Sequence, residues 1–444
     1  MSEQNESNSV SRRDVIKVAT AGVAATTLAY LPSTAEGMRR ILGANSRIHT
    51  GHVGLGVQGS THTRLLHERK QETNTEIIGL CDLYGRNLKD NKDKYGTSVK
   101  DGQSTGSYLK MLENKDIDAV WVATSDNWHS DVSIAALKAG KHVYCEKPMC
   151  KTIEEAFAVY DTVKATGKKF QVGSQGCSDM KWHVARKVVA SGTIGHVVVG
   201  QGSYMRNGRV GEWNNYGRFD RDAGPTASGD AHVDWETFRK GKGPKDFDPD
   251  RFFRWRKYWA YGSGLVGDLL PHRLHPLFIA MNLPTDGLKG FPVRVGSFGG
   301  LYVQKTNPVT GKPDRDVPDF INMMIDYEDC SLMAMSSCIN EQGWPDMIRG
   351  NKASVYFGGG GVEVKAERAW ADEVEGSVEP VPGMGERIET HHDNFLEAIR
   401  ENKVPNANID IAVRVMVGIA LGEMAYRQNK TFTFDAKTRT YKGA

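Results

Sequence analysis

The chain has 444 residues and a formal net charge of +3 at pH 7, which is close to balance. This length allows two domains and a large hydrophobic core. Because the sequence contains no block of like charge and no basic stripe, it argues against a nucleic-acid partner. The six cysteines lack CxxC spacing, so we expect mostly buried thiols, although export would permit a bond from Cys177 to Cys145 or Cys150.

Residues 1–36 have the pattern of a twin-arginine signal segment. Ser11, Arg12 and Arg13 precede a weakly apolar run at 18–31, and small residues follow at 33–35, where a cleavage site would lie. The run is about 14 residues long, whereas a membrane-spanning helix needs roughly 20, so no permanent membrane span is expected. We therefore expect the twin-arginine export machinery to deliver folded protein to the periplasm. A basic N-terminus followed by an ordinary short helix is the alternative.

A glycine-rich turn follows the first strand. A β-type run leads into GLGVQG at 54–59, and a helical pattern follows at 60–70. In this context Gly54 permits the tight turn, Gly56 lets a pyrophosphate approach the backbone, and Gly59 lets helix and strand pack closely. The pattern predicts a dinucleotide site, with a simple glycine turn as the alternative.

A carboxylate follows the second strand. Thr75 to Cys81 is typical of a strand and ends at Asp82, whose side chain would accept hydrogen bonds from the adenosine ribose. An acid at this position favours NAD over NADP, because the 2′-phosphate of NADP would meet like charge. Arg86 lies close enough to weaken this preference, so NADP stays open.

Strands and helices continue to alternate over residues 45–168. Asp116 to Thr124 is an apolar run typical of a buried parallel strand, a helix is expected at 131–139, and Gly140 to Cys145 is typical of a turn followed by another strand. Repeated units of this length predict a doubly wound parallel sheet, whose ligands lie at the carboxyl ends of the strands.

From about Arg47 onward the chain resembles the Gfo/Idh/MocA family of NAD(P)-dependent oxidoreductases. The resemblance rests on GLGVQG, on Asp82, on ATSDNWH at 123–129 and above all on AGKHVYCEKPM at 139–149. It implies an α/β fold, with an N-terminal Rossmann domain and a C-terminal α+β domain that carries a largely antiparallel open sheet. Further matching segments are VGSQ at 172–175, GTIGHV at 192–197, VDW at 233–235, GDLLPH at 267–272 and HHDNFLEAIR at 391–400.

The resemblance also implies roles for single residues. Lys147 would contact the nicotinamide side and the reacting hydroxyl, and Asp268 with His272 would form a pair in which the histidine is the acid/base. Oxidation of a secondary alcohol needs such groups, because a proton leaves oxygen as hydride leaves carbon, and a carboxylate can orient the histidine ring. The residues expected to contact the dinucleotide are Gly54, Gly56, Val57, Gln58, Gly59, Asp82, Arg86, Thr124, Ser125, Asn127, His129, Glu146, Lys147 and Gln175.

Simpler interpretations of the three catalytic candidates stay open. Lys147 could be a surface lysine, Asp268 a helix N-cap, and His272 a core histidine. Pro276 would interrupt a helix across 269–280, so a regular spacing of Asp268 and His272 along one helix is not assured.

The C-terminal domain, residues 169–444, carries extended segments separated by loops. Alternation in FINMMIDY and SLMAMSS predicts an antiparallel sheet with one covered face, and FQVGSQ at 170–175 is assigned to this half. In the family that the chain resembles, the other face commonly packs against another subunit, so a homo-oligomer is expected.

Between 205 and 263 lies a long stretch dense in aromatic and charged residues. Such a mixture suits a sugar, which stacks on rings and bonds to polar groups, although each aromatic could instead pack the loop onto its domain. We expect substrate contacts from Tyr204, Arg206, Asn207 and Trp259. No spacing matches a standard metal motif, so no metal is expected.

Together these features favour an NAD(P)-dependent oxidoreductase that transfers hydride between a nicotinamide cofactor and a secondary hydroxyl of a sugar or sugar derivative. One alternative is a glycosidase with tightly bound NAD that acts by transient oxidation, elimination, hydration and re-reduction. A non-catalytic NAD-binding protein is a third hypothesis, against which Lys147, Asp268 and His272 together argue.

Overall fold

The computed structural model describes residues 46–444 except 382 and 384, so the signal segment expected at 1–36 lies outside the described residues. Residues Ile48–Ala444 pack as one unit. Within the described residues, no helix is both long enough and apolar enough to cross a membrane.

A parallel sheet in the order β3-β2-β1-β4-β5-β6 occupies the N-terminal half of this unit. Each neighbouring pair is parallel, in keeping with the buried apolar runs of these strands. The chain proceeds outward from β1 to β3 and returns to β4 beside β1, which confirms the doubly wound sheet. The strands of this sheet are β1 (Ile48–Val53), β2 (Thr75–Cys81), β3 (Ser104–Thr105), β4 (Ala119–Val122), β5 (His142–Cys145) and β6 (Phe170–Val172).

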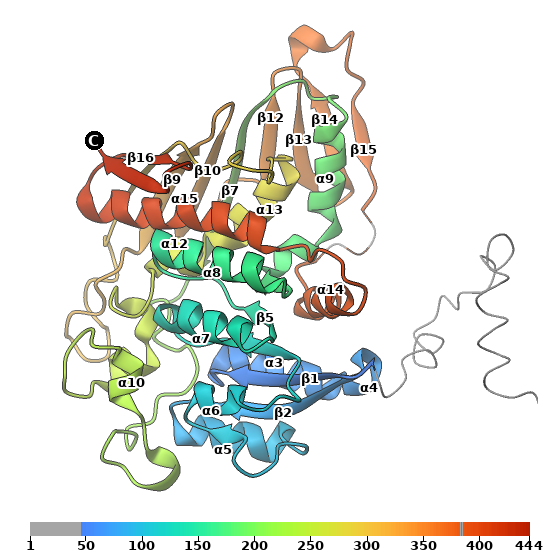
Figure 1. The fold of residues 1–444 in the computed structure, drawn as a ribbon. Helices are drawn as coiled ribbons and strands as arrows, with labels where there is room; N and C mark the ends of the chain where they lie inside the picture. The colour runs from blue at the N-terminus through green and yellow to red at the C-terminus, as the bar shows by residue number, and fades with distance from the viewer. Residues whose placement is uncertain (1–45, 382, 384) are drawn as a thin grey trace, which may run out of the picture. The chain divides into compact units, whose positions relative to one another are not determined.

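Helices alternate with these strands (Figure 1). The helix after β5 begins with a capping box, in which Thr152 and Glu155 each accept a hydrogen bond from the other's backbone N–H. It ends at Gly167, which adopts the left-handed conformation that favours glycine. The helices of this half are α3 (Val57–Glu68), α4 (Lys70–Thr73), α5 (Gly85–Tyr95), α6 (Tyr108–Leu112), α7 (Asp126–Lys138) and α8 (Ile153–Thr166).

The C-terminal half forms a larger sheet in the order β15-β14-β13-β12-β7-β10-β9-β8-β16-β17, with β11 paired to β7. Neighbours β7 and β10 run parallel, whereas β9 and β10, which contain FINMMID and SLMAMSS, are antiparallel like most of this sheet. The largely antiparallel C-terminal sheet is therefore confirmed. Its strands are β7 (Val197–Asn207), β8 (Arg294–Gly300), β9 (Phe320–Asp326), β10 (Ser331–Ser337), β11 (Ile339–Asn340), β12 (Met347–Gly350), β13 (Ala353–Gly358), β14 (Gly361–Ala366), β15 (Ser377–Glu379), β16 (Phe432–Asp435) and β17 (Thr440–Gly443).

Two C-terminal helices join the halves. α15 (Ile409–Gln428) packs against both β8 and α8 (Figure 1). α14 (Ile388–Arg400) places Phe395 against Trp121 of β4 and Tyr144 of β5, so the two halves share a core. Two further helices, α9 (Met180–Ala190) and α13 (Pro271–Ala280), pack against each other, and α13 also packs against β7.

Three local expectations are corrected. Phe170–Val172, assigned from the sequence to the C-terminal half, pairs parallel with β5 and is the edge strand of the first sheet. Pro276 does not interrupt α13, and the carbonyl of His272, which lacks a helical N–H donor because of this proline, accepts from Arg273 Nη1 at 3.1 Å. The thiols suggested for a disulfide are free, and they are Cys145, Cys150 and Cys177.

Residues 208–262, which we call the strap, leave the C-terminal half and contact the Rossmann sheet. Val233 forms a β-bridge with Tyr84, and the Asp234 N–H donates to the Leu83 carbonyl at 2.9 Å. The strap contains α10 (Trp235–Arg239) and α11 (Pro249–Phe253). Many of its aromatic side chains form an apolar cluster with Tyr84, so they pack the strap onto the first domain; these are Trp235, Phe238, Phe252, Tyr258 and Tyr261.

Candidate functional site

The turn between β1 and α3 depends on three glycines. Gly54 has a φ of +83°, and a Cβ there would lie 2.5 Å from the Ala123 carbonyl oxygen. A Cβ at Gly59 would lie 1.8 Å from the Gly54 carbonyl oxygen, so the helix can approach the turn only without one. A Cβ at Gly56 would meet nothing within 4 Å. Gly56 therefore leaves open backbone of the kind that a pyrophosphate requires.

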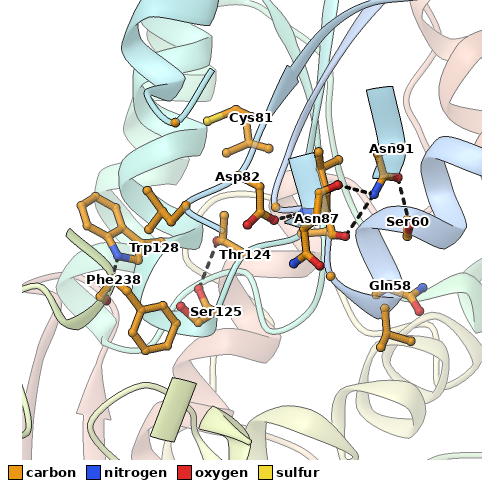
Figure 2. Close-up of a pocket in the computed structure, with 18 of the residues that line it drawn as sticks. Gln58, Ser60, Cys81, Asp82, Asn87, Asn91, Thr124, Ser125, Trp128 and Phe238 are labelled. Carbon is orange, nitrogen blue, oxygen red and sulfur yellow. Dashed lines mark hydrogen bonds between the residues drawn. The ribbon is translucent and has the colours of Figure 1, made fainter. Parts of the chain in front are cut away.

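A cavity of about 610 Å³ adjoins this turn. The carboxyl ends of β1, β2 and β4 form one side of it, and the strap supplies aromatic side chains on the other. Trp128 Nε1 donates to the Phe238 carbonyl at 3.2 Å, which ties the strap to α7 at the cavity. Figure 2 shows the lining residues Asp82 and Asn87 centrally, Trp128 and Phe238 on one side, and Ser60 and Asn91 on the other.

Asp82 is held at the end of β2 by the backbone around it. One carboxylate oxygen accepts from the Leu55 N–H at 2.6 Å, and the other accepts from the Tyr84 N–H at 2.8 Å. Burial raises the pKa of Asp82 to about 6, although these two hydrogen bonds act in the opposite direction. The unfilled space at Gly56 and the strand-end carboxylate at Asp82 together fit a dinucleotide.

Arg86 does not line this cavity. Its guanidinium lies 2.7 Å from Asp222 and 3.1 Å from Asp220, both on the strap. The strap residue Arg218 lines the cavity instead, where its charge lowers the pKa of Asp82 and its guanidinium pairs with Asp90.

The other residues expected to contact a dinucleotide fall into two groups. Val57, Gln58, Thr124 and Ser125 line the cavity together with Gly54 and Gly56, whereas Gly59 does not line it. The second group does not line it, and consists of Asn127, His129, Glu146, Lys147 and Gln175.

Two members of this second group, His129 and Asn127, form hydrogen bonds with backbone carbonyls of the loops around the cavity. His129 Nδ1 lies 2.6 Å from the Pro148 carbonyl oxygen, and its Nε2 lies 3.2 Å from that of Thr124. Asn127 donates to the Phe238 carbonyl of the strap at 3.4 Å. Gln175 begins a short 3-10 turn after β6.

Lys147 and Asp268 form a buried ion pair. Lys147 follows β5 and is joined to Pro148 by a cis peptide bond, and Asp268 ends α12 (Gly264–Asp268). Lys147 Nζ lies 2.7 Å from the carboxylate and 2.7 Å from the carbonyl oxygen of Asp268. The surface-lysine and N-cap interpretations are therefore wrong for these two residues, since each side chain is only 11% exposed and α13 begins after Leu270.

Two strap residues also donate to the Asp268 carboxylate. Arg256 Nε lies 3.2 Å from it, and Trp213 Nε1 lies 2.9 Å from it. Burial alone would raise the pKa of Asp268, but the charges of Lys147 and Arg256 hold it well below its ordinary range. Asp268 is therefore a carboxylate surrounded by donors.

His272 lies in the first turn of α13, with its ring stacked on Tyr204 at a centroid distance of 4.6 Å. Its Nδ1 is buried and has no hydrogen-bond partner among the described residues. Burial, helped by the charge of Lys147, lowers the pKa of His272 to about 3, which keeps the ring neutral. The expectation that Asp268 orients this ring is not met, because the Asp268 carboxylate bonds to Lys147, Arg256 and Trp213.

Two contacts connect the cavity to this group. Gln58 lines the cavity and donates to Glu146, the neighbour of Lys147, at 3.4 Å. Arg256 lines the cavity and contacts Asp268. Arg256 and Gln58 therefore stand between the cavity and the group that contains Lys147 and Asp268.

The four substrate candidates lie in different places. Arg206 pairs with Glu212 at 2.8 Å, and its guanidinium lies 5.5 Å from the centre of the Tyr204 ring, so Tyr204 and Arg206 both neighbour His272. Asn207 ends β7, where it pairs with Ile339. Trp259 lines a second cavity of about 640 Å³ with Tyr302, Tyr426 and Arg427.

Sequence reasoning did not single out Arg256 or Trp213. They reach Asp268 because the strap folds back over the site, and their separations from it, 12 and 55 residues, form no motif. Trp213 has a φ of +69°, which is uncommon for a residue other than glycine, but this value is visible only in the structure. Among the described residues, no group of three or more His, Cys, Asp or Glu side chains is arranged to hold a metal ion.

Comparison with protein-family models gives one match. Residues 48–174 match GFO_IDH_MocA, described as an oxidoreductase family with an NAD-binding Rossmann fold. The matched segment contains the glycine turn, Asp82 and Lys147.

Curated relatives match parts of the chain. An inositol 2-dehydrogenase of Salmonella typhimurium is 29% identical over 167 residues, which cover 37% of this chain and 48% of the relative. A levoglucosan dehydrogenase of Pseudarthrobacter phenanthrenivorans is 34% identical over 266 residues, which cover 57% of this chain and 58% of the relative. The chain thus spans about half the length of these relatives.

The fold is also found in solved structures. A levoglucosan dehydrogenase in complex with NADH and levoglucosan superposes with a TM-score of 0.62, at 18% identity, over 89% of this chain and 99% of the other. The two-sheet arrangement is therefore one that known proteins share.

Proposed function

We propose, from the match of residues 48–174 to the GFO_IDH_MocA oxidoreductase model, that the whole protein is an NAD-dependent oxidoreductase acting on a secondary hydroxyl of a sugar or sugar derivative. The observation that carries the proposal is the junction of two sites. The cavity beside the glycine turn reaches, through Gln58 and Arg256, the buried group formed by Lys147, Asp268 and His272. A dinucleotide site and proton-handling groups are thus contiguous.

The residues of this group divide the work on the hydroxyl. NAD, when bound, supplies the nicotinamide C4 that accepts hydride. Asp268 holds the Lys147 ammonium at 2.7 Å, where it can donate to the substrate oxygen and stabilise the developing alkoxide. His272 is neutral, so its imidazole can accept the hydroxyl proton.

The sugar class is supported by the surroundings and by the relatives. The Tyr204 ring beside His272 and the Arg206 guanidinium over it combine an apolar face with a polar edge, which suits a sugar. The relatives named above are dehydrogenases of inositol and of levoglucosan. The redox-neutral glycosidase is therefore not favoured.

A substrate screen tests this function. The purified protein is incubated with NAD and a panel of inositols, anhydrosugars and free aldoses, and in parallel with aryl glycosides in the absence of added NAD. NADH accumulation with a free polyol or sugar is the expected result. Aryl release without NADH accumulation, or no NAD-dependent oxidation of any carbohydrate, would overturn it.

Export and assembly are further parts of the proposal. The twin arginines at 12 and 13, before a short apolar run, support export to the periplasm by the twin-arginine route. Fusing residues 1–45 to a reporter exported only by that route tests it, with Arg12→Lys and Arg13→Lys as the control that should abolish export. Exposed Phe298 on β8 and Met324 on β9 support a homo-oligomer, which ultracentrifugation would test.

A further inference from the structure

Glu146 is the end of a buried chain of hydrogen bonds that runs away from the cavity. Glu146 Oε1 lies 2.8 Å from His62 Nε2 on α3. His62 Nδ1 lies 2.8 Å from His392 Nε2 on α14. Trp121 Nε1 of β4 also points to His392 Nε2, at 3.3 Å. Both histidines are at least nine-tenths buried.

The directions of these hydrogen bonds follow from Trp121. An indole N–H can only donate, so His392 Nε2 is an acceptor and carries no proton. His62 Nδ1 must then be the donor in its 2.8 Å contact with His392. The remaining nitrogen, His62 Nε2, faces Glu146, and a second proton lies between them.

The proton belongs to the histidine side of this contact. Glu146 accepts two further hydrogen bonds, from the Lys147 N–H at 3.2 Å and from Gln58 Nε2 at 3.4 Å, as a carboxylate does. Burial acts to raise the pKa of Glu146, but the hydrogen bond and charge of His62 outweigh it and hold the pKa at about 2.

We propose that His62 is a buried imidazolium paired with the Glu146 carboxylate, and that this ion pair, held from behind by His392, positions the Lys147 loop beside the cofactor cavity. The proposal rests on the proposed function for its catalytic consequence, but not for the charge of His62. His62 is a positioning residue, because it acts through Glu146.

Among the groups that surround the Glu146 carboxylate, His62 is the main cation. His62 faces Gln58 on its own helix, Glu146 after β5 and His392 on α14. Its ring also meets the Tyr144 ring in a T-shaped contact, with 5.2 Å between the ring centroids. Burial lowers the pKa of His392 well below its usual value, and burial also lowers the pKa of His391 to about 4 and of His52 to about 3, so these rings are neutral. The charged or titratable groups that face Glu146 besides His62 are Lys147, His272, His129, His391 and Tyr144.

The pair matters because Lys147 already has a partner. Its Nζ lies 2.7 Å from the Asp268 carboxylate. Without His62, the Glu146 carboxylate would compete for the Lys147 ammonium or take up a proton. Either change would alter the position of the Lys147 loop.

The charge of His62 can be measured without any substrate. Protein labelled with ¹⁵N at histidine is studied by NMR at pH 7, and His62→Gln identifies the His62 signals. We expect both ring nitrogens of His62 to carry a proton. A neutral His62 ring would overturn the proposal.

The positioning role is read from the pH dependence of kcat. In His62→Gln, burial would shift the Glu146 pKa upward into the assay range, so kcat should gain a new ionisation and fall by about 10- to 100-fold, with KM unchanged. In the double variant His62→Gln with Glu146→Gln, a neutral hydrogen-bonded pair replaces the ion pair and the new ionisation should vanish. His67→Gln, on the same helix but outside the chain of hydrogen bonds, is the matched control.

The outcomes separate the two proposals. An unchanged pH profile in His62→Gln would refute the positioning role. If His62→Gln does not fold, Glu146→Gln serves instead, and loss of one ring proton from His62 in that variant is the expected result. A charged His62 in a protein that oxidises no carbohydrate would refute the proposed function and leave the ion pair standing.

Discussion

Arg86 of the Rossmann domain donates two hydrogen bonds, of 3.0 and 2.7 Å, to Asp222 of the strap. The same guanidinium lies 3.1 Å from Asp220, so one side chain fastens the strap at the β2 side of the cavity. On the opposite side the strap is tied to α7 by the hydrogen bond from Trp128 to Phe238. A bound dinucleotide would therefore lie between two contacts that hold the strap to the Rossmann domain.

Loosening the strap should release the cofactor faster. Arg86→Gln removes the contacts with Asp220 and Asp222, and we expect the rate of NAD dissociation to rise several-fold with little change in the folded state. Stopped-flow fluorescence of bound NADH measures this rate. Arg64→Gln removes an ion pair confined to α3 and should leave the rate unchanged. Equal rates in wild type and Arg86→Gln would show that the strap does not limit release.

Substitutions at two glycines should separate cofactor binding from folding. Gly56→Val adds atoms to open space beside the cavity, so the melting temperature should hold while NAD affinity falls more than tenfold. Gly59→Ala places a Cβ against the Gly54 carbonyl and should cost about 3 kcal/mol of stability. Calorimetric titration and thermal melts measure the two effects. Tight NAD binding by Gly56→Val would argue against a pyrophosphate at this turn.

Removing the proposed base should affect kcat more than stability. His272→Ala deletes the neutral imidazole, and kcat should fall by roughly 10²- to 10⁴-fold. His275→Gln is the control, because the His275 ring bonds to Ser174 and to the Pro271 carbonyl instead. Steady-state kinetics with a substrate from the carbohydrate screen make the measurement. An active His272→Ala variant would remove His272 from the mechanism.

Stability should fall as the pH drops from about 6.5 towards 4. Several buried histidines have a lowered pKa, so the unfolded chain binds protons in this window that the folded chain does not. Each extra proton lowers the free energy of unfolding by about 1.4 kcal/mol per pH unit. Asp82 and Asp126, whose burial raises the pKa to about 6 and about 7, oppose the trend, and so do Asp316, Asp346 and Asp393, whose pKa burial also raises, but in the described part of the chain these five groups are fewer than the seven histidines. Among the described residues these histidines are His52, His129, His142, His272, His275, His391 and His392.

Urea unfolding at a series of pH values checks this prediction. His275→Gln removes one of the groups and should flatten the slope between pH 4 and 6.5, because burial lowers the pKa of His275 to about 4. A free energy of unfolding that is constant over this window would contradict the neutral state of these rings.

Local patterns in the sequence are sufficient to predict the two sheets and the glycine turn. β2 begins and ends at the residues expected, and β5 lies within the predicted turn and strand at 140–145, because apolar runs bounded by turns are encoded by neighbouring residues. Gly54 and Gly59 could be assigned for the same reason, since their constraints arise within the turn itself. The identity of β6 could not, because an edge strand and the first strand of the next domain look alike in sequence.

The partners of the catalytic candidates were beyond local reasoning. Lys147 meets Asp268 across 121 residues, and Arg86 meets Asp222 across 136. Nothing near Arg86 in the sequence indicates that an acidic strap will neutralise it, so it was assigned to the cofactor. Likewise, no local pattern points to His62, because its partner His392 is 330 residues away.

The strap also sets the order in which this protein can acquire its nucleotide. The glycine turn and Asp82 are synthesised early, but the opposite side of the cavity, including Arg218 and Phe238, emerges from the ribosome only after the whole Rossmann sheet. A fragment that ends at residue 174 would bind NAD weakly and exchange it freely. Holding the nucleotide is therefore a property of the finished chain, acquired late in its biogenesis, and not of the domain that carries the binding motif.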